Sequence, residues 1–144
     1  MKKLMIALAC FVLVLSSLVF MSYGEMQKIA ISKATLSDLK GDWVGSRTTG
    51  SGDQRNTDLT ISNDSLPLQC KFTLYEFANI QERGKTKTLD RDLKGKINDQ
   101  GNLLVEAGDV INVELSLYDD GGKKKLEGNY FWAGRKGTMS FKKK

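Results

Sequence analysis

The chain has 144 residues, with 22 lysines and arginines against 17 aspartates and glutamates, and a net charge of +5. It has no histidine and two cysteines, which excludes Ser-His-Asp triads, Cys-His dyads and histidine-ligated metal sites. The charge is too small to indicate nucleic-acid binding. We therefore expect a protein that is not an enzyme and that holds no metal or cofactor, although chemistry that needs only carboxylates stays open.

Residues 1–24 have the features of a signal peptide. Two lysines precede an apolar run over residues 4–21, and Ser22 and Gly24 place small residues at the −3 and −1 positions of a cleavage site. The sequence predicts export to the periplasm or the medium, with cleavage after Gly24. The alternative is an uncleaved membrane anchor. Cleavage leaves 120 residues, enough for one domain with one core and no transmembrane segment.

The mature chain is expected to divide into a loose N-terminal arm at residues 25–34 and one domain at residues 35–144. A short helical turn opens the domain, with Thr35 or Ser37 as its cap. From there, apolar and polar residues alternate, which is typical of half-buried strands, and glycine-containing turns separate the alternating segments. We predict strands at 39–46, 56–63, 68–77, 85–97, 102–107, 110–117, 124–132 and 138–142.

Three of these strands share a pattern in which a glycine lies between two large apolar residues at every second position. The glycines are Gly41, Gly95 and Gly128. Residues two apart on a strand share a face, so each glycine is expected on the buried face, where it permits a bend. The sequence therefore predicts an all-β fold, a single antiparallel up-and-down barrel of about eight short strands. Short strands and few aromatic residues favour a soluble barrel over an outer-membrane barrel.

The stretch L-K-G-D-W-V-G at residues 39–45 resembles the lipocalins and the wider calycin group, in which a helical turn leads into Gly-x-Trp on the first strand. Gly41 and Trp43 match this motif, whereas the group's Thr-Asp-Tyr motif is missing. The resemblance implies an eight-stranded barrel that binds a small, mostly apolar ligand. It also implies that the tryptophan closes one end beneath an arginine from the C-terminal part of the chain. Arg135 is the candidate for that role, with a solvated turn residue as the alternative.

Aromatic residues near a predicted strand end suggest a ligand site. Tyr130 and Trp132 share a face, and a tryptophan at a barrel mouth beside Arg135 and Lys136 suits an amphipathic or anionic ligand. The alternative is a tryptophan that only caps the core. The candidate ligand contacts are Trp43, Phe72, Tyr130, Trp132 and Arg135.

Other reactive or charged residues are interpreted as structural. Cys70 shares its face with apolar neighbours, which predicts a buried thiol rather than an intermolecular disulfide. Asp90 and Asp92 are expected on a solvated face. The lysine-rich segments suggest weak, salt-sensitive contact with an anionic envelope surface.

An eight-stranded barrel is wide enough either to be filled by side chains or to hold one small ligand. The sequence therefore leaves two hypotheses. The first is an exported, non-catalytic binding protein for a small apolar or amphipathic ligand. The second is a structural or protein-interaction module of the cell envelope with a filled barrel.

Overall fold

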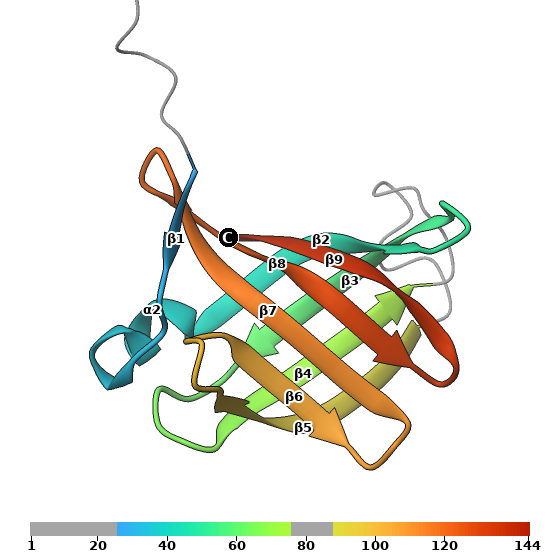
Figure 1. Ribbon diagram of the computed structural model, residues 1–144, viewed down its shortest axis with the longest axis horizontal. Helices are drawn as coiled ribbons and strands as arrows, with labels where there is room; N and C mark the ends of the chain where they lie inside the picture. The colour runs from blue at the N-terminus through green and yellow to red at the C-terminus, as the bar shows by residue number, and fades with distance from the viewer. Residues whose placement is uncertain (1–25, 76–87) are drawn as a thin grey trace, which may run out of the picture.

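The computed structural model describes residues 26–75 and 88–144, so the predicted signal peptide lies outside the described residues. The chain forms one sheet that curls into a barrel, with a short helical segment at one end (Figure 1). The elements are β1 (Gln27–Ile29), η1 (Lys33–Thr35), α2 (Leu36–Leu39), β2 (Gly41–Thr49), β3 (Gln54–Ile61), β4 (Leu68–Tyr75), β5 (Thr88–Ile97), β6 (Leu103–Ala107), β7 (Ile111–Asp120), β8 (Lys123–Trp132) and β9 (Arg135–Lys143).

The barrel consists of strands β2 to β9. Each pairs antiparallel with the next along the chain, and β9 pairs back with β2, in a register that places Lys143 opposite Trp43 and Gly137 opposite Thr49. This closed, up-and-down arrangement of eight strands confirms the predicted fold class. The strands follow one another around the barrel in chain order because short turns connect the alternating segments, and antiparallel neighbours need only a hairpin connection.

Part of the N-terminal arm, expected to be loose, is instead attached to the barrel. β1 pairs with β7, Gln27 opposite Asp119 and Ile29 opposite Leu117, and Ile31 is buried. β6 pairs with β7 only as far as Leu115, which leaves the rest of that edge free for β1. Covering a free strand edge removes a site of unwanted pairing, which explains why a segment without a clear pattern becomes a strand.

The three repeated glycines are required for different reasons. A Cβ at Gly95 would lie 2.8 Å from the Leu103 Cδ1 atom, in the packed interior. A Cβ at Gly128 would meet the backbone carbonyl of Glu114 on β7, so the two strands approach closely there. Gly41 instead has φ +129° where α2 passes into β2, a conformation that favours glycine. Neighbouring groups therefore approach closely at Gly95 and Gly128, whereas Gly41 provides the positive φ between α2 and β2.

One end of the barrel, here called the closed end, is covered by α2. Leu36 and Leu39 of α2 belong to the core. Trp43 is fully buried, and its Nε1 donates a hydrogen bond to the Leu39 carbonyl at 2.8 Å. The Lys143 Nζ donates to the Asp38 carbonyl at 2.6 Å and lies 5.6 Å from the centroid of the Trp43 ring. These contacts fasten the helical turn and the last strand to the same tryptophan.

The cation beside Trp43 is therefore Lys143, and the prediction that Arg135 takes this role was wrong. The register of β2 and β9 explains the error. Arg135 begins β9 at the opposite end of the barrel, here called the mouth, whereas Lys143 ends β9 beside Trp43. Two residues on one strand that are eight positions apart lie roughly 26 Å apart.

Candidate functional site: a cavity at the barrel mouth

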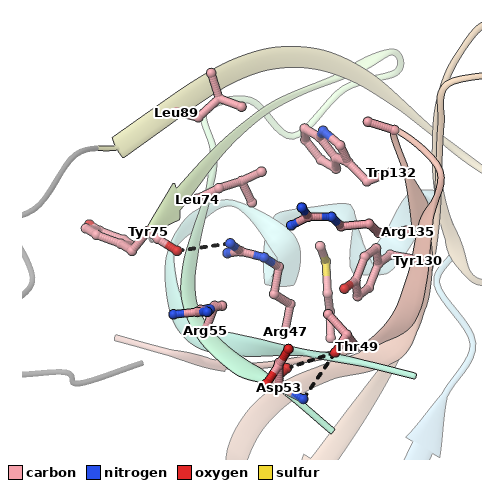
Figure 2. Close-up of a pocket in the computed structure, with 12 residues that line it drawn as sticks. Arg47, Thr49, Asp53, Arg55, Leu74, Tyr75, Leu89, Tyr130, Trp132 and Arg135 are labelled. Atoms are coloured by element: carbon pink, nitrogen blue, oxygen red, sulfur yellow. Dashed lines mark hydrogen bonds between the residues drawn. The ribbon is translucent and has the colours of Figure 1, made fainter. Parts of the chain in front are cut away.

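The mouth holds a cavity of about 670 Å³ (Figure 2). This volume falls within the range of roughly 300–1,000 Å³ that is usual for small-molecule sites. The closed half of the barrel, by contrast, is filled by fully buried side chains that include Trp43, Leu59 and Leu126. The described residues that line the cavity are Arg47, Thr49, Asp53, Arg55, Leu74, Tyr75, Leu89, Tyr130, Trp132, Ala133, Arg135 and Met139.

One wall of the cavity is polar because the inward positions of β2 and β3 change character along the strands. Alternate residues of a strand share a face, so the inward row of β2 continues from Trp43 and Gly45 to Arg47 and Thr49. The inward residues of β3 also change from apolar to polar toward the mouth, in the order Ile61, Leu59, Thr57 and Arg55. Asp53, in the turn before β3, continues this row. The same two strands therefore supply apolar core at the closed end and charged groups at the mouth.

The opposite wall is apolar and partly aromatic. Leu74 and Leu89, which are partners in the β4–β5 pair, border the cavity together with Trp132. Beneath Trp132 lies Phe72, fully buried, with the ring centroids 5.6 Å apart and the planes at 72°. This edge-to-face geometry is favourable for aromatic pairs, so the two rings form a firm apolar floor under the open space.

Arg47 is held against the polar wall by three hydrogen bonds to neutral acceptors. Its Nη1 donates to the Asn56 carbonyl at 2.9 Å and to the Thr57 Oγ1 at 2.7 Å, and its Nη2 donates to the Tyr75 carbonyl at 2.9 Å. A guanidinium has five N–H groups, so at least two remain for water or a ligand. Figure 2 shows Arg47 and Arg135 extending into the cavity.

The electrostatic environment of Arg47 is unfavourable for a positive charge. Burial lowers the pKa of the Arg47 guanidinium below its usual range, and the nearby charges of Arg55 and Arg135 lower it further, while Tyr130 acts in the opposite direction. Arg55 lies directly opposite Arg47 in the β2–β3 register. Like charges directly opposite each other are unfavourable in a strand pair.

The structure brings three of the five predicted ligand contacts together. Tyr130, Trp132 and Arg135 all line the cavity, and the first two point inward from β8 as expected. Phe72 lies one layer deeper, behind Trp132. Trp43 lies at the closed end and does not border the cavity.

The polar wall was missed by the sequence analysis. Arg47, Thr49 and Arg55 were not identified because the predicted strands ended at residue 46 and began at residue 56. The hairpin extends to residues 49 and 54. Continuing the alternation from Trp43 would have placed Arg47 and Thr49 on the inward face, so the signal was present in the spacing.

The residues interpreted as structural lie away from the cavity. Cys70 is buried, and burial raises the pKa of its thiol to about 12. Asp90 is exposed and pairs with Lys71 at 3.2 Å, and Asp92 is also exposed. Within residues 26–75 and 88–144, no three cysteines and acidic residues gather closely enough to hold a metal ion. In the same residues no helix is long and apolar enough to cross a membrane.

Comparisons with known proteins add no family to this description. No protein-family model, curated protein or solved structure matches the chain.

Proposed function

We propose that this protein is an exported, non-catalytic binding protein whose barrel mouth takes one small amphipathic ligand. The observation that carries the proposal is the cavity of about 670 Å³ with one apolar wall and one cationic wall. An amphipathic molecule would place its apolar part against Leu74, Leu89 and Trp132. Its polar part would then lie toward the arginines.

The filled-barrel hypothesis is supported only for the closed half. There the inward side chains pack without exposure around Trp43, as a purely structural module requires. At the mouth, in contrast, the inward positions include Arg47 and Arg55, which are poor choices for filling a core. This contrast favours the binding protein over the interaction module.

The binding proposal is tested by titration with decanol and decanoate, followed by thermal unfolding and intrinsic fluorescence. A ligand at about 100 times its dissociation constant should stabilise the fold by roughly 2.7 kcal/mol. Trp132→Ala should weaken this shift, because Trp132 borders the cavity. Phe131→Ala is the matched control, since Phe131 is 40% exposed on the outer face and its loss should leave the shift unchanged. Absence of a saturable shift with either probe would contradict the proposal.

The export proposal rests on residues 1–24 alone. N-terminal sequencing of the protein purified from its native host should begin at Glu25. Material that begins at Met1 would contradict cleavage.

A further inference from the structure

We infer that the polar wall of the mouth binds a dianionic head group, of the phosphate monoester type, carried on an apolar tail. This inference rests on the proposed function and names the chemical class of the ligand. It depends on the charge balance of the cavity, the placement of Arg47 and the free donors of Arg135.

The first step is the missing counterion of Arg47. Its three hydrogen-bond acceptors are two backbone carbonyls and one hydroxyl, all neutral, and no carboxylate of the described residues forms a salt bridge with it. A half-buried cation without a counterion is costly. Its hydrogen bonds to Asn56, Thr57 and Tyr75 nevertheless fix the position of the guanidinium. An anionic ligand bound in the cavity would balance this positive charge.

The second step is the charge of the described lining residues. Arg47 and Arg135 both line the cavity, and neither forms a salt bridge with a carboxylate of the described residues, so they contribute two positive charges that those residues do not pair. Asp53 is exposed, and among the described residues its carboxylate is bonded only to the hydroxyl of Ser51, at 3.5 Å. It therefore does not neutralise Arg47.

The third step is the free donors of Arg135. This side chain lines the cavity (Figure 2) and makes no hydrogen bond or ion pair with the described residues. Guanidinium groups present paired N–H donors that match the oxygens of phosphate and carboxylate. A phosphate monoester carries about −1.5 to −2 charges at neutral pH, which matches the two positive charges of Arg47 and Arg135 better than a single carboxylate does.

The experiment compares ligands that share one tail and differ in head charge. Decyl phosphate, decanoate and decanol are titrated by calorimetry below their aggregation concentrations, against the full mature protein at constant salt. We expect affinity to fall in that order, by about tenfold at each step, because each step removes about one head-group charge. Inorganic phosphate at millimolar concentration should not displace decyl phosphate, because it lacks the tail.

The variant is Arg135→Gln, with Lys136→Gln as its matched control. Both remove one positive charge from neighbouring exposed residues, but only Arg135 lines the cavity. Arg135→Gln should weaken the binding of decyl phosphate about tenfold and that of decanol much less, and Lys136→Gln should change neither. A thermal-unfolding curve like the parent's would show that the variant folds.

The possible failures are distinguishable. Equal affinity for decanol and decyl phosphate, or equal effects of the two variants, would overturn the dianion site and leave the binding function intact. Displacement of decyl phosphate by inorganic phosphate would contradict the proposal of an amphipathic ligand. It would indicate that the site binds phosphate itself. Failure of all three ligands to bind would overturn both proposals.

Discussion

The closed end and the mouth of the barrel are built from the same strands, yet they differ in what those strands turn inward. At the closed end, β2 and β9 enclose Trp43 beneath α2, and its one polar atom, Nε1, has a partner. At the mouth, the inward row of β2 places Arg47 opposite Arg55 beside an open cavity. The same alternation of inward and outward residues thus produces a packed core at one end of the strands and a charged pocket at the other.

This difference separates stability from binding. The closed end buries large side chains and satisfies its polar atoms, which stabilises the folded state. The mouth brings like charges together and leaves space empty, which lowers stability. Charged residues at positions that would otherwise be apolar core are expected where a ligand binds, so the two ends should respond differently to mutation.

The largest effect is expected from Trp43→Ala. Removing a fully buried tryptophan should lower the free energy of unfolding by roughly 3–5 kcal/mol, measured by urea denaturation. Trp132→Ala is the matched change at the mouth. It should cost less, because Trp132 already borders an open cavity. Equal losses of unfolding free energy in the two variants would contradict the distinction between a packed closed end and an open mouth.

A smaller loss is expected from Gly128→Val, where the packed half meets the cavity. The new side chain would meet the Glu114 carbonyl on β7, and overpacking should cost roughly 1–3 kcal/mol. Gly50→Ala is the control, because the nearest atom to its Cβ would be the Lys136 carbonyl at 3.8 Å. Equal denaturation midpoints for Gly128→Val and the parent would show that the two strands do not approach closely.

A pH-dependent effect is expected from Cys70 in the packed half. Its folded pKa of about 12 lies above the ordinary value of 9.0, so the unfolded state releases the thiol proton first as pH rises. The stabilisation by the neutral thiol is complete below about pH 9 and is lost between pH 9 and 12, at up to about 1.4 kcal/mol per pH unit. Urea denaturation of the parent and of Cys70→Ala should diverge over this window. Parallel pH profiles would mean that the thiol is not buried.

The smallest effect on stability is expected from Arg135→Gln at the mouth. The Arg135 side chain is exposed and makes no hydrogen bond with the described residues, so the free energy of unfolding should change by less than about 0.5 kcal/mol. A loss above 1 kcal/mol in urea denaturation would give Arg135 a structural role and weaken its assignment to a ligand.

The fold was predictable because alternation and turn glycines are local signals. The same signals predicted the buried thiol of Cys70 and the inward direction of Tyr130 and Trp132. β1 was not predictable, since its pairing depends on an edge of β7 that β6 leaves free. The cation beside Trp43 depends on the register of two strands about 100 residues apart in sequence, which spacing within one strand does not reveal. Arg47 and Arg55 were missed because the boundaries of the β2–β3 hairpin were drawn too short.

The most direct test of the central claim uses the two tryptophans as reporters of the two ends. Trp43→Phe leaves Trp132 at the mouth as the single tryptophan, and Trp132→Phe leaves Trp43 at the closed end. Both variants are titrated with decyl phosphate while emission is recorded and binding is followed by calorimetry. The account predicts a saturable change in Trp132 emission, with a midpoint that matches calorimetry, and no change in Trp43 emission. A response from Trp43 alone, or no response from either tryptophan, would contradict a ligand site at the mouth.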